Sequence, residues 1–496
     1  MFTRRVLAPL ALLVAVSAPA LAQTPPPEPP PPSEPPPAPP APPPTAPAEP
    51  PAPPPMAPPP AAEPPHEEPA ALHAKWEADI YGFVELDSIY DSTQGLNDLE
   101  GNSTVARPNT YTGDHGQTTF GARNSRIGIN LHAPTYNQMK ASAKLEMDFL
   151  GNQPGTPQTA TGLVSEQAFW QNPGFRVRHM YVKLETPYLD ILAGQTWQLF
   201  GWQTMAHENS VQIQGVAGQV YSRSPQIRLS KTIKSGDIGV EIAVAASRPP
   251  QRASATPDGQ AGIKFVDSAI QALHTAGSTG TSIDGLSVGV SVVGRRFAVN
   301  NFAATSNKQV TANGYGISLD ALVPIIPATK KHKANALTFT GSFVDGAGIA
   351  DLYQSLNGGV GNPALPNPGM ANPAPTYTAN VDGGMVQWFA DAAAPGGFSL
   401  HPIQWTSYIF GLQYYLPPSG KVWLSANYSH MESSNAHNFG ATTKIWDHED
   451  WADGNLFVDL TPAVRFGFEF AWTQQQFVDK TDATDYRGQF SAFYLF

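Results

Sequence analysis

The chain has 496 residues, a formal net charge of −11 and no cysteine. Only 14% of its residues are Asp, Glu, Lys or Arg, against about 25% in ordinary soluble domains, and 41% are hydrophobic. The acidic balance argues against a nucleic-acid partner. Low charge is typical of a protein that faces lipid on one side and a wet lumen on the other.

Residues 1–22 have the three parts of a secretory signal peptide. Arg4 and Arg5 form the charged start, an apolar run follows, and Ala20-Leu21-Ala22 is a small-residue cleavage site. No later segment has 18 uninterrupted apolar residues, the length that a membrane helix needs. We therefore expect a chain that leaves the cytoplasm and enters a membrane, if at all, as strands.

A proline-rich arm follows the signal within a predicted linker, residues 23–77. Residues 25–69 hold 27 of the chain's 51 prolines, a density that excludes helix and sheet interiors. We expect a disordered, solvated segment of polyproline II character that acts as a spacer. The alternative is a periplasmic tether that binds peptidoglycan or a periplasmic protein through residues 25–69.

From residue 78 onward, hydrophobic residues alternate with polar ones, as on strands with two unlike faces. The clearest case is 139–149, where six apolar residues face one way and five polar residues, four of them charged, face the other. Long and short connections alternate, as in a barrel with one rim outside the cell and one in the periplasm. Residues 78–496 are thus predicted to form an all-β fold, a transmembrane antiparallel β-barrel. The sixteen expected strands are 80–90, 118–133, 138–149, 175–185, 188–198, 225–233, 236–247, 261–271, 286–293, 314–323, 335–344, 404–416, 421–431, 454–460, 463–473 and 486–496.

Two of these strands have a weak pattern. In 175–185, Arg176 and Arg178 share parity with apolar Met180 and Val182, a conflict that a β-bulge would resolve. The strand 261–271 has the least regular alternation of the sixteen. Propeller and sandwich folds fit less well, because the chain has no repeated blade motif and places long loops at every second connection.

The last strand ends on aromatic residues. Counting back in steps of two from Phe496 gives Tyr494, Ala492 and Phe490, an apolar face. A barrel has to pair its last strand with its first to remove both open edges. This ending resembles the closing strand of Gram-negative outer-membrane barrels, in which the barrel-assembly machinery reads the terminal Phe. That resemblance makes Tyr494 and Phe496 the assembly signal, whereas the plainer alternative is an ordinary terminal strand.

Three further stretches carry a closer resemblance: 82–91, 175–182 and 193–200, followed by Gln226-Ile227-Arg228. With the signal, the strand count and the terminal Phe, they make the chain similar to the trimeric general porins and, more narrowly, to the DcaP-like porins. The resemblance implies a homotrimer among outer-membrane lipids that passes small hydrophilic solutes by passive diffusion and favours small organic anions. Some members carry a coiled-coil extension before the barrel, which the proline-rich arm does not match.

In the porin class the third external loop folds into the barrel and narrows it. Here that loop is 199–224, and an alternative is that it only caps the rim. Its candidate constriction residues are Trp202, His207, Glu208, Gln212, Gln214 and Tyr221.

Strand parity predicts which charged residues face the lumen. Opposed charged walls would create a transverse field that steers anions, and the alternative is a set of ion pairs that only keeps the lumen hydrated. The basic candidates are Arg126, Lys140, Lys144, Arg176, Arg178 and Arg228, and the acidic candidates are Glu85, Asp87, Glu146 and Asp148.

The sequence contains no catalytic motif and no cofactor-binding motif, so we predict neither an enzyme nor a metal or cofactor site. The run Asp447-His448-Glu449-Asp450 is expected in an external loop, where solvated acidic residues are more common than a divalent-cation site. Residues 345–403 are predicted to be the longest loop. The second functional hypothesis is a plugged structural barrel that tethers the outer membrane to the cell wall, and a lipid hydrolase is a distant third.

Overall fold

The structure is a computed structural model. The predicted signal peptide and the proline-rich arm lie outside the residues that it describes, so both stay predictions. The described residues are 76–94, 105–151, 174–202, 210–212, 215–249, 256–276, 280–300, 309–328, 333–353, 386–394, 397–436 and 446–496.

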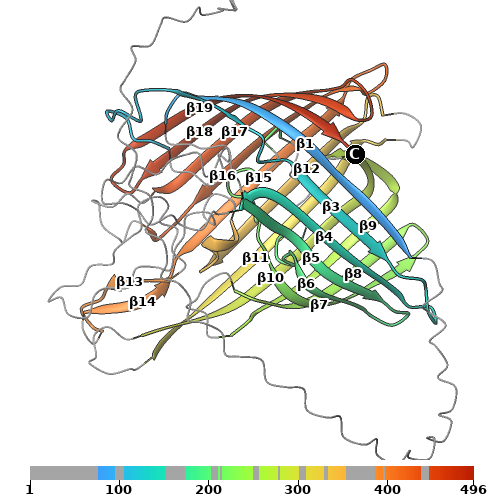
Figure 1. The fold of residues 1–496 in the computed structure, drawn as a ribbon. Helices are drawn as coiled ribbons and strands as arrows, with labels where there is room; N and C mark the ends of the chain where they lie inside the picture. Colours follow the sequence, from blue (N-terminus) through green and yellow to red (C-terminus); the bar gives the residue numbers. More distant parts are fainter. Residues whose placement is uncertain are drawn as a thin grey trace, which may run out of the picture. The chain divides into compact units, whose positions relative to one another are not determined.

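Seventeen strands form one antiparallel sheet that closes on itself (Figure 1). β2 and β3 both pair with β1 along its length, so together they occupy one barrel position and the barrel has sixteen. The sixteen-strand prediction is confirmed. The strands are β1 (Glu77–Asp91), β2 (Gln117–Gly121), β3 (Arg126–His132), β4 (Lys140–Gly151), β5 (Gly174–Glu185), β6 (Asp190–Trp197), β7 (Arg223–Ser235), β8 (Ile238–Ser247), β9 (Asp258–Thr275), β10 (Thr281–Asn300), β11 (Gln309–Ile326), β12 (Leu337–Ala347), β15 (Gln404–Tyr415), β16 (Val422–Glu432), β17 (Trp446–Asp459), β18 (Val464–Phe477) and β19 (Asp482–Leu495).

The first and last strands form the seam of the barrel. β1 pairs antiparallel with β19 from Phe83 opposite Leu495 to Asp91 opposite Arg487. The terminal residue continues the ladder, because Gly82 N donates to Phe496 O at 2.9 Å and Phe496 N donates to Gly82 O at 3.1 Å. The seam provides hydrogen-bond partners for backbone N–H and C=O groups that would otherwise be exposed to hydrocarbon.

The two ends of the barrel differ. Short connections and the carboxyl terminus lie at one end, which we call the turn end (Figure 1). The other end, which we call the loop end, carries a separate hairpin of β13 (Val386–Ala390) and β14 (Phe398–Pro402). Among the residues that the structure describes, no helix is long and apolar enough to span a bilayer.

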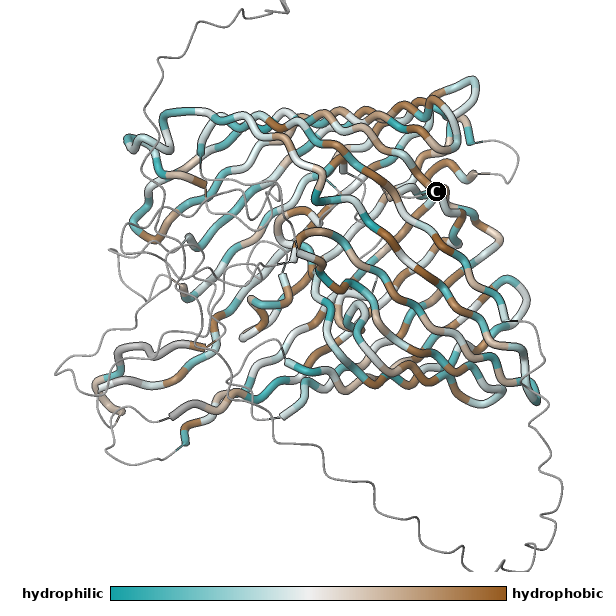
Figure 2. Tube along the Cα trace, in the orientation of Figure 1, coloured by the Kyte–Doolittle hydropathy of each residue, from teal (hydrophilic) through white to brown (hydrophobic). Residues whose placement is uncertain are grey.

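Hydrophobic and hydrophilic residues interleave along the strands (Figure 2). On β1, Val84 and Leu86 are more than half exposed on the outside, whereas Glu85 and Asp87, which alternate with them, are buried in the interior. An apolar outer surface is stable in hydrocarbon and unstable in water. Exposed aromatic residues flank the apolar band at both ends, namely Tyr90, Phe120, Phe175 and Tyr486 towards the loop end and Trp76, Tyr136 and Tyr188 towards the turn end.

Several predicted boundaries were too short. The expected strand 286–293 is part of β10, which runs from Thr281 to Asn300, and 454–460 is part of β17, which begins at Trp446. In both cases the ladder continues into sequence whose hydropathy no longer alternates, namely 294–300 in β10 and 446–453 in β17, so the pattern does not signal a strand there. The expected single strand 118–133 is interrupted by residues 122–125, where Ser125 N donates to Ala122 O.

One loop prediction was right only in part, and another was wrong. Part of 345–403 is ordered as the end of β12, the short 3-10 helix η4 (Ala350–Leu352) and the β13–β14 hairpin. The hairpin is joined where Asp391 N donates to Gly397 O at 2.8 Å, and Gly397 has φ 78°, a conformation that favours glycine. The run Asp447–Asp450 lies within β17 and not in an external loop.

The parity conflict in β5 is resolved by a β-bulge. Glu146 of β4 pairs with His179, but the next residue, Met147, pairs with Val177, so Arg178 is the extra residue. Arg178 and His179 are consequently both buried, although they are adjacent in sequence, while Met180 is 52% exposed on the outside. The bulge brings one more charged side chain into the interior than regular alternation allows.

Candidate functional site

The interior of the barrel is the candidate site, and the chain that follows β6 enters it. Phe200 N donates to Gln260 Oε1 on β9 at 3.0 Å, and Gly201 N donates to Ser291 Oγ on β10 at 3.1 Å. Trp202 then packs against the wall at Gly262, where a Cβ would come within 2.7 Å of the indole. Glycine at this position allows the ring to approach the strand.

The same connection reaches a distant part of the wall at residues 210–212. Val211 N donates to Asn455 Oδ1 on β17 at 2.9 Å and to Glu469 Oε2 on β18 at 2.8 Å. Gln212 N donates to the same carboxylate oxygen at 3.0 Å. The connection is therefore bonded to β9 and β10 near its start and to β17 and β18 further on, so it spans the interior.

The returning part of the connection is anchored to a third region. Gly218 O accepts from Ser407 Oγ on β15 at 2.9 Å, and Tyr221 N donates to Leu352 O at 2.9 Å. Of the six predicted constriction residues, the structure places Trp202, Gln212 and Tyr221 inside the barrel, and Gln212 and Tyr221 are buried. The other three, His207, Glu208 and Gln214, lie outside the described residues.

A second segment, residues 348–353, also lies inside the barrel. The buried Arg295 of β10 pairs with Asp351 and, at 3.1 Å, with Asp258, and it donates to Gly348 O at 2.8 Å. Ile349, Leu352 and Tyr353 around this triad are completely buried. Burial raises the pKa of the Tyr353 phenol above its ordinary value, against the hydrogen bond from Ser407, so the phenol stays protonated.

Apolar side chains fill part of the interior. A larger cluster near the loop end surrounds residues 348–353, and a smaller one near the turn end contains Trp423 and Phe457, whose rings stack at 3.8 Å. These side chains have the burial of a protein core. The larger cluster includes Phe297, Ile349, Tyr353, Trp405 and Trp446, and the smaller one includes Tyr415, Trp423 and Phe457.

The predicted basic and acidic residues meet on one wall. Arg178 Nε lies 2.7 Å from Glu146 Oε1 and its NH1 lies 3.3 Å from Asp148 Oδ2, while Arg176 NH2 lies 2.6 Å from Asp148 Oδ2. Arg126 and Lys144 are within 4.0 Å of Glu146, at 3.7 and 3.8 Å. Four cations thus surround two carboxylates, and these acids are interleaved with the bases and do not form an opposed wall.

The remaining predicted residues lie around this cationic group. Asp87 accepts from Asn124 Nδ2 at 2.7 Å and from Gln489 Nε2 at 3.2 Å, and Glu85 is fully buried beside it. Arg228 donates to Trp197 O at 2.7 Å, which keeps it against the wall. Lys140 is exposed at the turn end, opposite Glu185.

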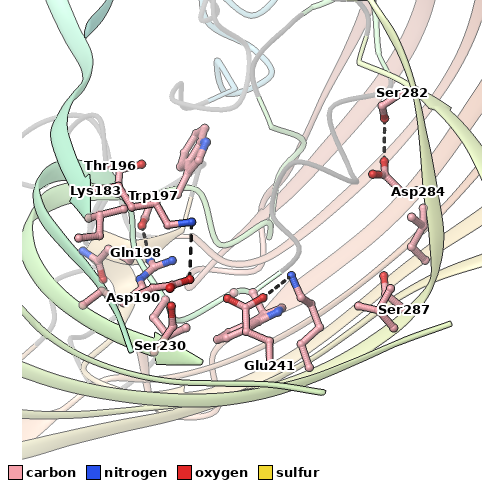
Figure 3. Close-up of a pocket in the computed structure, with 18 of the residues that line it drawn as sticks. Lys183, Asp190, Thr196, Trp197, Gln198, Ser230, Glu241, Ser282, Asp284 and Ser287 are labelled. Atoms are coloured by element: carbon pink, nitrogen blue, oxygen red, sulfur yellow. Dashed lines mark hydrogen bonds and ion pairs between the residues drawn. The ribbon is translucent and has the colours of Figure 1, made fainter. Parts of the chain in front are cut away.

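A cavity of about 700 Å³ lies against the inner surface of β5 to β10 (Figure 3). Its charges are paired, because Lys183 Nζ lies 3.8 Å from Asp190 Oδ2 and Lys264 Nζ lies 3.2 Å from Glu241 Oε2. Ser282 donates to Asp284 at 2.7 Å on the far side of the same space. The cavity has a mixed polar and apolar lining in which three bases face three acids, in contrast to the excess of cations in the group on β3 to β5.

Sequence reasoning missed several interior residues. Arg295 lies beyond the end of the expected strand 286–293, so its parity was not considered. Glu241 and Glu469 were on recognised strands, and strand parity would have placed both inside. The contact of Glu469 with residues 211 and 212 joins distant parts of the chain, and alternation along one strand carries no signal of it.

No protein-family model matches the sequence, and no curated protein matches it. Solved structures do. The outer-membrane channel DcaP of Acinetobacter baumannii is 16% identical, with 86% of this chain and 98% of that chain covered and a TM-score of 0.56. An anion-selective porin from Comamonas acidovorans is 10% identical over 85% and 100% of the two chains, with a TM-score of 0.46. OmpF of Salmonella typhi, in complex with daunomycin, is 8% identical over 84% and 97%, with a TM-score of 0.46.

At such low identity, a structural match identifies a fold and does not carry over the residues of a site. The match to DcaP nevertheless covers nearly all of that chain. It is consistent with the closed barrel that the strand pairing shows independently. The comparison therefore shows that this chain, whose own strand pairing gives a closed sixteen-stranded barrel, shares its fold with the outer-membrane channel DcaP.

Proposed function

We propose that the protein is an outer-membrane porin that passes small hydrophilic solutes by passive diffusion. The observation that carries the proposal is the combination of an apolar outer surface with a polar, charged inner surface and a connection that narrows the interior. A wet lumen of limited width admits small polar solutes and excludes large ones. Membership of the DcaP-like porins, proposed from the sequence motifs, is supported by the structural likeness to DcaP.

A preference for small anions is part of the proposal. The cationic group of Arg126, Lys144, Arg176 and Arg178 contains two more positive charges than its carboxylates, Glu146 and Asp148, neutralise. In a narrow channel bounded by low-dielectric walls, such an excess raises the local concentration of anions. We also propose that the protein forms a homotrimer in the outer membrane. The barrel-assembly machinery would insert each barrel after it recognises Tyr494 and Phe496.

Single-channel recording in a planar bilayer with a salt gradient tests this function. We expect stepwise currents and a reversal potential whose sign reports anion preference. Currents with a cation-selective reversal potential would support the porin function and contradict the anion preference. A folded barrel without current would reject the porin.

One observation favours the second candidate function, a plugged barrel that tethers the membrane through its proline-rich arm. Residues 348–353 and the apolar clusters occupy part of the interior with core-like burial. If they block the lumen, the purified barrel will not conduct. Cells that express a variant without residues 24–70 would then lose attachment of the barrel to peptidoglycan, which is measured by sedimentation of the cell-wall fraction.

A further inference from the structure

Four ionisable side chains form a patch on the outer surface of the barrel near the loop end. His430 and Glu432 lie on β16, and His448 and Asp450 lie on β17. Residues two apart on a strand share a face. The register places His430 opposite Asp450 and Glu432 opposite His448, so the four side chains occupy one patch, which we call the outer histidine cluster.

The carboxylate of Asp450 orients both imidazole rings. It lies 2.9 Å from His430 Nδ1 and 2.7 Å from His448 Nε2, and Tyr428 OH donates to it at 2.8 Å. Because a carboxylate only accepts hydrogen bonds, each ring donates through the nitrogen that contacts it. The opposite nitrogens, His430 Nε2 and His448 Nδ1, are then available as lone-pair donors. Carboxylates orient metal-binding histidines in this way.

The ligand atoms are close enough for one metal ion. One ligand atom each from His430, Glu432 and His448 lie within 4.8 Å of one another, and His430 Nε2 is 3.8 Å from Glu432 Oε2. A tetrahedral ion with bonds of 2.0–2.1 Å separates neighbouring ligands by about 3.4 Å. Glu432 is exposed at the end of β16, so its side chain is free to make this small adjustment.

The position of the cluster also needs an explanation. The outer faces of the same two strands continue towards the turn end as exposed Leu424 and Leu456. Charged groups next to an apolar outer band destabilise a membrane barrel in proportion to their depth. A bound cation that neutralises the carboxylates removes part of that cost.

We propose that the outer histidine cluster is a zinc site. His430 Nε2, His448 Nδ1 and the Glu432 carboxylate bind the ion, water completes the coordination, and Asp450 positions the two rings. Two imidazoles and one carboxylate suit Zn²⁺, whereas Ca²⁺ and Mg²⁺ prefer oxygen ligands. This inference does not depend on channel activity and departs from the sequence prediction of no metal site.

Adjacent residues in the run 447–450 do not form this site together. Strand alternation directs Asp447 and Glu449 into the barrel, where both are buried and Glu449 accepts from Gln475. The site combines the outward half of the run with two residues of β16. Cross-strand pairing, and not proximity in sequence, assembles the ligands.

Titration of the purified full-length protein in detergent with Zn²⁺, followed by calorimetry, tests the proposal. We expect one tight site per chain, weakened at least tenfold in His430→Gln, His448→Gln and Glu432→Gln. Loss of the orienting carboxylate in Asp450→Asn is expected to weaken binding about 10- to 100-fold. His115→Gln is the matched control, because His115 is exposed, bonded to Tyr111 O and remote in sequence from the cluster.

Heat-modifiable migration on gels verifies that each variant is folded. If a histidine variant does not fold, Glu432→Gln still tests the site, because Glu432 is exposed. Zinc-edge X-ray absorption of the wild type is expected to show two imidazole ligands. Absence of Zn²⁺ binding in the wild type would overturn the proposal. So would unchanged affinity in folded His430→Gln and His448→Gln, a spectrum without imidazole, or tighter binding of Ca²⁺ than of Zn²⁺.

Discussion

At the scale of single residues, Glu469 holds the connection between β6 and β7 against the opposite wall. One of its carboxylate oxygens accepts from the backbone of both Val211 and Gln212. Val211 N has a second acceptor in Asn455, but Gln212 N has no other acceptor given by the structure. Glu469, together with Asn455, therefore holds residues 211 and 212 against β17 and β18.

Glu469→Ala is expected to release residues 210–212 from the wall. Loss of the acceptor leaves a buried N–H unsatisfied, which costs about 1–3 kcal/mol, and the conductance of single channels should increase and become noisier. Glu469→Gln is the control, because its amide oxygen still accepts. Planar-bilayer recording checks the pair, and equal conductance in both variants and the wild type would contradict this role.

Lys144 tests the origin of anion preference. It is partly exposed and lies 3.8 Å from Glu146, which keeps Arg126 and Arg178 as partners when the lysine is removed. A unit charge 4–8 Å from a solute in a wet lumen contributes about 0.5–1 kcal/mol. Lys144→Gln should therefore lower the anion-to-cation permeability ratio about two- to fivefold, as measured from reversal potentials.

Lys480→Gln is the matched control for Lys144→Gln. Lys480 is 67% exposed in the connection between β18 and β19, at the loop end of the barrel, where its ammonium lies 3.6 Å from Asp447 Oδ2. Its removal changes the net charge equally, so the permeability ratio should stay as in the wild type. An equal effect of both substitutions would mean that surface charge, and not the lumen wall, determines selectivity.

At the scale of elements, the alternation of hydrophobic and polar residues predicted the barrel strands accurately within the hydrophobic band and inaccurately beyond it. The pattern of 139–149 fixed the faces of β4 correctly because each side chain there meets either lipid or the lumen. In the outer part of β10 two arginines, Arg295 and Arg296, are followed by three apolar residues, 297–299, so hydropathy does not alternate there and did not reveal the strand. The bulge at Arg178 was recognisable as a conflict of parity, but its exact place depends on pairing with β4.

The site was less predictable than the strands, for a related reason. Strand parity predicted which charged residues line the wall, but it could not show that Glu146 and Asp148 pair with Arg178 and Arg176. The positions of Val211 and Gln212 depend on contacts with strands more than 200 residues away. Local pattern carries no information about such contacts.

Closure of the barrel gives a prediction for two glycines at the seam. A Cβ at Gly82 would lie 2.3 Å from Arg126 O and 2.9 Å from the Phe496 ring, whereas a Cβ at Gly488 on the adjoining β19 would meet nothing within 4 Å. Gly82→Ala should destabilise the barrel by about 1–3 kcal/mol through overpacking. Gly488→Ala should not, and heat-modifiable gel migration across a temperature series measures both.

Equal melting of the two glycine variants would argue against tight packing at the seam. The comparison is well matched, because both positions lie on strands of the same seam and both substitutions add one methyl group.

At the scale of the whole molecule, the barrel is complete without the proline-rich arm. The closed sheet begins at Glu77 and ends at Leu495, and its seam is formed within those residues. Removal of residues 24–70 should therefore leave single-channel conductance and thermal stability unchanged. Loss of conductance in the truncated protein would assign the arm a part in the pore itself.

The seam also has a consequence for the order of folding. Ser491 on the last strand donates a hydrogen bond to Asp87 on the first strand, 404 positions earlier in the sequence. Nearly the whole barrel sequence therefore lies between the two strands that have to pair. The entropic cost of closing a loop rises slowly with its length, but contacts between such distant residues form late. One edge of the first strand therefore stays unpaired until the last strand forms its hydrogen bonds with it. A chain that loses its final strand would keep that edge open, and the edge would then be a template for pairing with another chain.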